Sequence, residues 1–175
     1  AYLLIYEKLP TSKELSDYKA KLKKLRDLPP RVRTVLEQLP KSTHPMDVLR
    51  TGISALGTFE PEHDGHLSNG AKEIADRLIA CTPSMLCYWY HYANSGKQIE
   101  CSTNADSIGG HFLEMLHGEV PSAEWERAMH ASLILYAEHE FNASTFTARV
   151  IAGTGSDIYS AITGGIGALR GPKHG

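Results

Sequence analysis

The spacing of apolar residues constrains the fold of this chain more than any other feature of its sequence. Apolar side chains return every three or four residues, as in the stripe formed by Leu15, Tyr18, Leu22 and Leu25. This spacing places them on one face of a helix. The alternation typical of a half-buried strand is nearly absent, and valine occurs at only five positions. The sequence therefore predicts an all-α fold, packed as a multi-helix globule.

Capping residues and prolines divide this pattern into separate elements. Thr11 and Glu14 have the form of a capping box, and Pro45 suits the first turn of another helix. Thr82 followed by Pro83 has the form of a cap and a first helical position, which predicts a helix boundary there. The predicted helices cover residues 11–28, 32–39, 45–56, 71–80, 82–92, 107–116, 121–136, 144–152 and 156–169, with a loop over 59–70 and a short strand or helix end over 2–6.

Composition and charge exclude several classes of protein. With 42% hydrophobic residues among 175 and a net charge of -2, the chain does not have the composition of a disordered protein. It has no apolar run long enough to span a bilayer, and its balanced charge indicates no general nucleic-acid surface. We therefore expect neither a membrane nor a nucleic-acid partner. One basic run indicates either a solvated helix face or a contact to a polyanionic cofactor. Its residues are Lys19, Lys21, Lys23, Lys24 and Arg26.

The cysteines indicate a reducing compartment. Cys81, Cys87 and Cys101 are odd in number and are not spaced as C-x-x-C, so we expect no disulfide framework and a location in the cytoplasm. Cys81 and Cys87 lie in an apolar stretch, which favours buried, unreactive thiols. A catalytic cysteine paired with His91 is the alternative.

The segment 138–145 collects two carboxylates, an imidazole, an amide and hydroxyls at a predicted helix end. The two glutamates favour the cationic form of His139. A cationic histidine beside Asn142 and Ser144 can hold a ligand that carries a carboxylate. Ordinary capping by Asn142 or Ser144 is the alternative. No zinc motif occurs, and consecutive helical side chains point to different sides, so we predict no metal site.

The segment 164–175 is rich in glycine and ends in Gly-Pro-Lys-His-Gly, a turn that would project His174 from a constrained backbone. It is not a dinucleotide fingerprint, because no strand precedes it and the glycine spacing differs. It is not a P-loop either, because its lysine is not followed by serine or threonine. Spacing alone leaves open whether the glycines serve helix packing or a ligand.

Taken together, four segments resemble the citrate synthase family, and most closely the branch that makes 2-methylcitrate. They are residues 44–47 (HPMD), 107–112 (SIGGHF), 135–150 (LYAEHEFNASTFTARV) and 166–175 (IGALRGPKHG). The helical order before them also fits, so the resemblance covers essentially all 175 residues. The combination of the His139 segment with the Gly-Pro-Lys-His-Gly turn is specific.

The resemblance implies a role for four residues. His174 matches the catalytic histidine that donates a hydrogen bond to the thioester oxygen as the enol forms. His139 matches the histidine that binds oxaloacetate, and Asn142 matches a polar residue that lines this site. Ser144 is expected to hold His174 in the required tautomer. The implied substrates are oxaloacetate and propionyl-CoA or acetyl-CoA; no further cofactor is implied, because the CoA thioester is itself a substrate.

The resemblance also implies a larger protein. Residues 1–175 correspond to part of the family's large helical domain, whereas the small CoA-binding domain, a second catalytic histidine and the catalytic aspartate lie downstream. We therefore expect these 175 residues alone to be inactive, and the intact parent to be an acyltransferase of propionate catabolism that forms a homodimer or higher homo-oligomer. Citrate synthesis from acetyl-CoA is one alternative. If the gene ends at Gly175, a non-catalytic helical interaction module is another.

Overall fold

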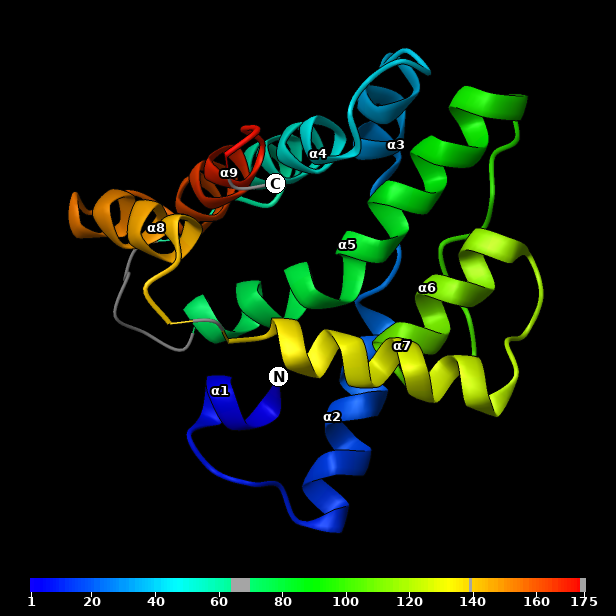
Figure 1. The fold of residues 1–175 in the computed structure, drawn as a ribbon, viewed down its shortest axis with the longest axis horizontal. Coiled ribbons are helices and arrows are strands. Elements are labelled where there is room, and N and C mark those ends of the chain that lie inside the picture. Colours follow the sequence, from blue (N-terminus) through cyan, green and yellow to red (C-terminus); the bar gives the residue numbers. More distant parts are fainter. Residues whose placement is uncertain (64–69, 139, 174–175) are drawn as a thin grey trace.

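The computed structural model describes residues 1–63, 70–138 and 140–173, and within them it contains helices and no strand (Figure 1). The all-α prediction is thus confirmed. The helices are α1 (Tyr2–Tyr6), α2 (Ser12–Lys24), α3 (Pro30–Glu37), α4 (Pro45–Phe59), α5 (Gly70–Ser95), α6 (Ile108–His117), α7 (Ala123–Tyr136), α8 (Ala143–Gly153) and α9 (Ile158–Leu169).

Capping side chains fix the starts of these helices. At α2 the Thr11 hydroxyl accepts from the Glu14 N–H, and the Glu14 carboxylate accepts from the Thr11 N–H, so the predicted capping box forms. At α6 the Ser107 hydroxyl accepts from the N–H of Gly110 at 2.8 Å. These bonds satisfy backbone donors that have no partner inside the helix. This is why these sequence signals placed the helix starts correctly.

The predicted helix boundary at Thr82 and Pro83 is wrong, because α5 runs through it without a break. Instead of capping a new helix, the Thr82 hydroxyl donates to the carbonyl of Leu78 at 2.7 Å. Cys81 and Met85 are both fully buried, so packing on the two sides of Pro83 outweighs the loss of one backbone bond. Figure 1 shows that α5 bends near its middle, as expected for a helix with an internal proline.

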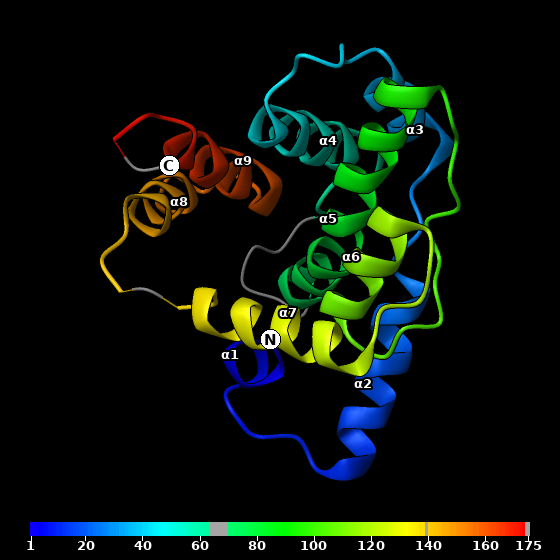
Figure 2. The same cartoon turned by 45° about the vertical axis from the view of Figure 1, so that its right-hand side comes forward.

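The main hydrophobic core lies where α3, α4, α5 and α6 meet. Figures 1 and 2 show α5 crossing the centre of the molecule, with α3 and α4 on one side and α6 on another. Leu36, Leu56 and Met85 bring side chains from three of these helices into the core and are completely shielded from solvent. Burial of such apolar side chains is the dominant favourable contribution to folding.

A buried carboxylate attaches the N-terminal helices to α5. Asp76 is fully buried, and its oxygens accept from the Tyr18 hydroxyl at 2.7 Å, from the Tyr6 hydroxyl at 2.8 Å and from Lys21 at 2.7 Å. Three donors, one of them charged, offset the cost of removing this carboxylate from water. The basic run is therefore not uniformly solvated. Its last member, Arg26, which follows the end of α2, is itself buried and donates to the Thr103 carbonyl.

The C-terminal helices pack in two separate places. α9 packs between α4 and α8, and α7 packs on α6 (Figure 2). Two adjacent glycines of α6 allow α7 to pack closely on it. A Cβ atom at Gly109 would lie 3.0 Å from the backbone nitrogen of His130, and one at Gly110 would lie 2.7 Å from a Glu126 oxygen. Since neither side chain exists, α6 and α7 pack closely at this point.

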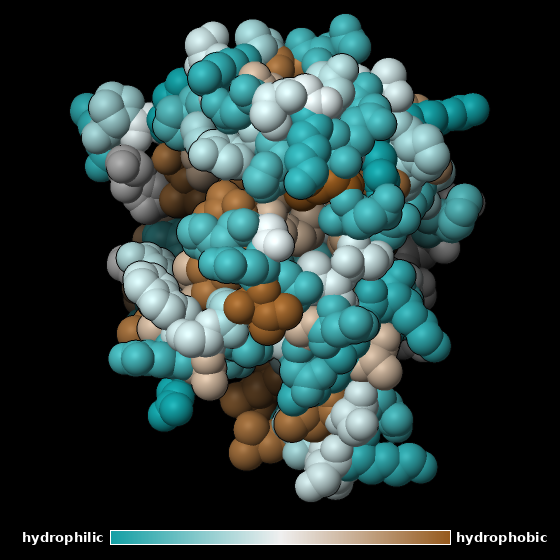
Figure 3. Space-filling model, turned by 90° about the vertical axis from the view of Figure 1, so that its right-hand side faces the viewer, coloured by the Kyte–Doolittle hydropathy of each residue, from teal (hydrophilic) through white to brown (hydrophobic). Residues whose placement is uncertain are grey.

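The exposed apolar side chains are unevenly distributed over the surface. The face on which the end of α5 lies beside α6 is largely hydrophilic, with separate hydrophobic patches (Figure 3). By contrast, α7 and α8 contain no buried residue and carry several large exposed apolar side chains. They are Trp125, Leu133, Ile134, Leu135, Tyr136, Phe146 and Val150. No helix among the described residues is both long and apolar enough to cross a membrane.

Candidate functional site

The structure places two of the four predicted site residues. Asn142 and Ser144 lie at the start of α8, whereas His139 and His174 lie outside the described residues. The roles predicted for these two histidines therefore stay predictions. What the structure adds is the framework around them: the start of α8, the segment before it and the end of α9.

Asn142 is the N-cap of α8, as the capping interpretation of this segment predicted. Its Oδ1 accepts from the N–H of Thr145 at 2.7 Å and from the hydroxyl of Ser144 at 2.6 Å. Both bonds are made by the amide oxygen, so neither uses the N–H donors of the side chain. Capping is thus compatible with ligand binding, because the donor end of an amide suits a carboxylate.

The segment before this cap has an unusual backbone conformation. Glu140 and Phe141 have φ values of 34° and 51°, in the left-handed region that residues with a side chain rarely adopt. The N–H of Glu140 donates to the Glu138 carboxylate at 2.6 Å, which helps to hold this turn. Phe141 is 99% exposed, so burial of its own ring does not offset the strain. Such strain concentrates at functional sites, and here it lies directly beside His139.

α9 approaches the start of α8 closely at one glycine. A Cβ atom at Gly165 would lie 3.3 Å from the Ser144 carbonyl oxygen and 3.7 Å from the Cβ of Ala148. The absence of a side chain lets α9 pack against the first turn of α8. The later part of α9, which leads into Gly171, therefore lies at the same end of the helix pair as Asn142.

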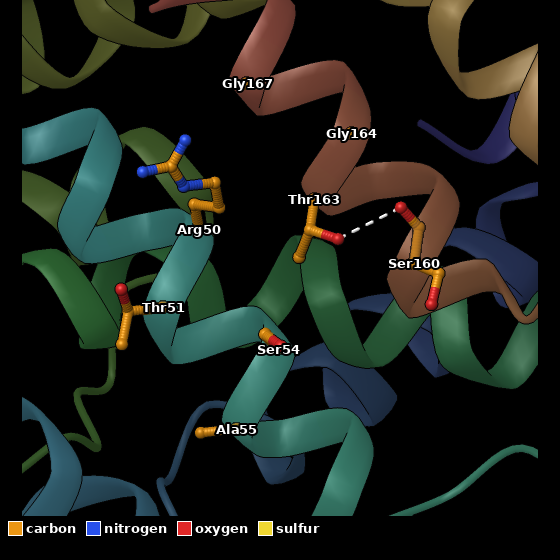
Figure 4. Close-up of a pocket in the computed structure, with 8 residues that line it drawn as sticks. All are labelled: Arg50, Thr51, Ser54, Ala55, Ser160, Thr163, Gly164 and Gly167. Atoms are coloured by element: carbon orange, nitrogen blue, oxygen red, sulfur yellow. Dashed lines mark hydrogen bonds between the residues drawn. The ribbon is translucent and has the colours of Figure 1, made fainter.

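A polar groove of about 720 Å³ lies between α4 and α9. Figure 4 shows the residues that line it from the two helices, with Thr163 donating to the Ser160 carbonyl at 3.0 Å. The lining residues are Arg50, Thr51, Ser54, Ala55, Ser160, Thr163, Gly164 and Gly167. Hydroxyl groups and one guanidinium make this groove suitable for polar groups rather than for an acyl chain. No motif in the sequence predicted this groove.

An ion network ties the end of α9 to the start of α4. The Asp47 carboxylate accepts from Arg170 Nε at 3.1 Å through one oxygen and from Arg50 Nη2 at 3.0 Å through the other. Arg170 is the C-cap of α9, and Asp47 lies in the first turn of α4. Both lie in segments that carry the family resemblance, but only the fold brings them together.

The buried thiols do not belong to this site. Burial raises the pKa of Cys81 to about 11 and those of Cys87 and Cys101 to about 12, so the reactive thiolate is disfavoured. His91 instead bonds the Met115 carbonyl oxygen through Nε2 at 2.9 Å. Among the described residues, no group of three or more His, Cys, Asp or Glu side chains is arranged to hold a metal ion.

His111 also lies within the core rather than in a site. It is completely buried, and its ring nitrogens lie 3.1 Å from the Ser84 hydroxyl and 3.0 Å from the Thr103 hydroxyl. Burial, with a smaller contribution from the nearby charge of Arg26, lowers its pKa to about 4. The imidazole is therefore neutral at pH 7 and fixes the position of α6.

These observations define an all-helical protein with a strained, capped turn of polar residues at the start of α8. The family model of the citrate synthase C-terminal domain matches residues 1–175. The chain belongs to the citrate synthase family.

Comparison with individual proteins agrees with this membership. The 2-methylcitrate synthase of Shewanella oneidensis is 55% identical over all of this chain and 46% of its own. The citrate/2-methylcitrate synthase of Bacillus subtilis is 38% identical over 99% of this chain and 46% of its own. The citrate synthase of Thermoplasma acidophilum, solved with carboxymethyl-CoA and oxaloacetate, superposes with a TM-score of 0.88 at 30% identity and covers 99% of this chain and 45% of its own. The chain thus spans about half the length of these relatives.

Proposed function

We propose that the complete protein containing this chain condenses propionyl-CoA with oxaloacetate and water to give 2-methylcitrate and free CoA. The observation that carries the proposal is the 55% identity to a 2-methylcitrate synthase along the entire chain. The capped, strained turn around Asn142 supports it, because such a turn suits the binding of a carboxylate substrate. Propionate catabolism in the cytoplasm is the corresponding role.

In this proposal each site residue has a defined task. His174 donates a hydrogen bond to the thioester oxygen, where negative charge develops as the enol forms, and it must be neutral to do so. His139 and the N–H donors of Asn142 bind oxaloacetate. Ser144 holds His174 in the required tautomer by donating its hydroxyl proton to the other ring nitrogen, in place of its present bond to Asn142 Oδ1. The CoA thioester enters as a substrate, and we propose no resident cofactor or metal.

Citrate synthesis from acetyl-CoA is the second candidate. One relative is named for both activities, and the solved neighbour is a citrate synthase. The two acyl groups differ by one methylene, which a hydrophobic pocket discriminates by only about 1–3 kcal/mol. We therefore expect a preference for propionyl-CoA with measurable activity toward acetyl-CoA.

The domain organisation and assembly are part of the proposal. Residues 1–175 form part of a large helical domain, and a smaller CoA-binding domain together with the catalytic base follows in the complete protein. The large exposed apolar side chains of α7 and α8 support a homo-oligomer, because exposed apolar surface of this kind is typical of protein interfaces. Sedimentation analysis of the complete protein should therefore show a dimer or a higher oligomer.

The decisive experiment measures free CoA released by the complete gene product. Release should require oxaloacetate together with an acyl-CoA, and mass spectrometry should identify 2-methylcitrate. His174→Ala should lower kcat by about 100-fold or more, because the developing charge loses its donor. Unchanged turnover in this variant would exclude the assigned role.

Two control measurements separate this proposal from its alternatives. Residues 1–175 alone should release no CoA, since proton abstraction lacks its base. Reading the coding sequence past Gly175 tests the non-catalytic interaction module, because a stop codon at that point would favour the module over the enzyme. Equal kcat/KM for acetyl-CoA and propionyl-CoA would favour citrate synthesis as the main activity.

A further inference from the structure

The start of α4 holds the carboxylate of Asp47 in a restricted position. His44 caps this helix by accepting the Met46 N–H on Nδ1, and Pro45 occupies its first position. Asp47 follows in the first turn, where the helix dipole favours an anion. Its side chain is 26% exposed, less than either arginine that it contacts. The carboxylate is therefore more restricted in position than its partners.

Asp47 connects two helices through its separate oxygens. Arg50, one turn further along α4, donates to Oδ1 at 3.0 Å, and Arg170 of α9 donates to Oδ2 at 3.1 Å. The bond to Arg170 joins residues 123 positions apart in the sequence. The guanidinium of Arg50 also lies beside the end of α9, with Nη1 4.0 Å from the position of a Cβ atom at Gly167. Figure 4 shows Arg50 on α4 beside this part of α9.

We propose that Asp47 is a positioning residue that fixes the end of α9 through Arg170, and with it the turn that leads to His174. The inference rests on the proposed function of His174, which follows Arg170 by four positions in the sequence. The opposite end of α9 is held independently, because a Cβ atom at Gly57 of α4 would meet the Tyr159 ring at 2.7 Å. Asp47 thus holds the end of α9 that precedes the predicted catalytic turn in the chain.

This role affects reaction geometry more than folding. Exposed ion pairs stabilise folded proteins only slightly, because water and salt screen the charges. Catalysis is more sensitive, since a misplacement of about 1 Å can lower a rate roughly 100-fold. Loss of the Asp47 charge should therefore lower turnover while leaving the thermal midpoint and oxaloacetate binding close to their original values.

The test uses Asp47→Asn in the complete gene product, with Asp106→Asn as matched control. Asp106 also contacts two cations, Lys23 at 2.6 Å and Lys19 at 3.8 Å, but these lie on α2, away from α9. Asp47→Asn should lower kcat by about tenfold, less than the loss expected for a 1 Å misplacement, with an unchanged KM for oxaloacetate. Asp106→Asn should leave kcat unchanged.

Substitutions of Arg170 test the same contact from the side of α9. Arg170→Gln should lower kcat as Asp47→Asn does, and the double variant should be no slower than either single variant, since both remove one interaction. Arg170→Lys should restore part of the activity. Additive losses in the double variant would overturn this inference but not the proposed function. The same holds for an active enzyme in which Asp47→Asn and Asp106→Asn have the same kcat. A wild-type protein that releases no CoA would overturn the proposed function as well.

Discussion

α5 differs sharply from the pair formed by α7 and α8. α5 contributes nine buried residues, among them Asp76 and Ser84, which are hydrogen-bonded within the core. α7 and α8 contribute no buried residue, although they carry Ile134, Leu135 and Phe146. The described part of this chain therefore contains one region that is fully packed and one whose apolar side chains are largely exposed.

This difference predicts that different regions of the chain determine its stability and its binding of a ligand. Two of the four predicted site residues, Asn142 and Ser144, lie at the start of α8, where the local backbone is held by capping and by contact with α9 rather than by burial. Substitutions in α5 and its neighbours should therefore change folding, whereas substitutions near Asn142 should change ligand binding. Three further predictions test this separation, and they are ordered by the size of the expected effect.

The largest effect on folding should come from Leu56→Ala in the core. Leu56 is completely buried, and removing its side chain should lower the free energy of unfolding by about 2–5 kcal/mol through lost burial and a residual cavity. Denaturant unfolding at low protein concentration measures this change. Leu135→Ala is the matched control at a concentration that dissociates the proposed oligomer: Leu135 is 80% exposed in the single chain, so the change should stay within about 0.5 kcal/mol. A cost at Leu135 as large as that at Leu56 under these conditions would contradict the difference between α5 and α7.

A pH-dependent effect should follow from His111. Its pKa is about 4 in the folded protein against 6.5 for an unperturbed histidine, so between these values the unfolded state binds the extra proton. The His111 contribution to stability is therefore complete above pH 6.5 and decreases as the pH falls toward 4, by about 1.4 kcal/mol per pH unit. The free energy of unfolding, measured from pH 7 to pH 4.5, should fall more steeply in the wild type than in His111→Gln. Parallel curves would contradict this prediction.

The smallest effect on stability should come from the cap of α8. Asn142→Ala removes the acceptor of the Thr145 N–H and should cost about 1 kcal/mol, together with weaker oxaloacetate binding. Asn142→Asp separates the two functions, because aspartate caps a helix equally well but repels a carboxylate ligand. Calorimetry of the complete protein should show normal stability and weaker oxaloacetate binding for this variant. Normal binding by Asn142→Asp would limit Asn142 to capping.

Much of the fold could be predicted from local signals. The capping box at Thr11 and the proline at the start of α4 formed as predicted, because each involves groups within a few residues of one another. The same local reasoning was wrong at Thr82 and Pro83. There, the burial of Cys81 and Met85 against distant helices kept α5 continuous. Local sequence contains no information about such packing.

The candidate site could be predicted only in part. The sequence indicated capping and ligand binding as alternative roles of this segment, and the structure confirms capping by Asn142. The contact between Asp47 and Arg170 joins residues 123 positions apart, so no spacing rule could reveal it. Likewise, the close approach of Gly165 to Ser144 depends on how α8 and α9 pack. Such contacts require the complete arrangement of the helices.

The sequence alone determined the helical class of this protein, the starts of most helices and the segments that resemble the citrate synthase family. It could do so because helix periodicity, capping and motif identity are properties of neighbouring residues. Only the tertiary structure decided that α5 continues through Pro83, that Arg26 and His111 are buried, and that Asp47 connects α4 to the end of α9. These features depend on burial and on contacts between distant segments, which exist only once the chain has packed.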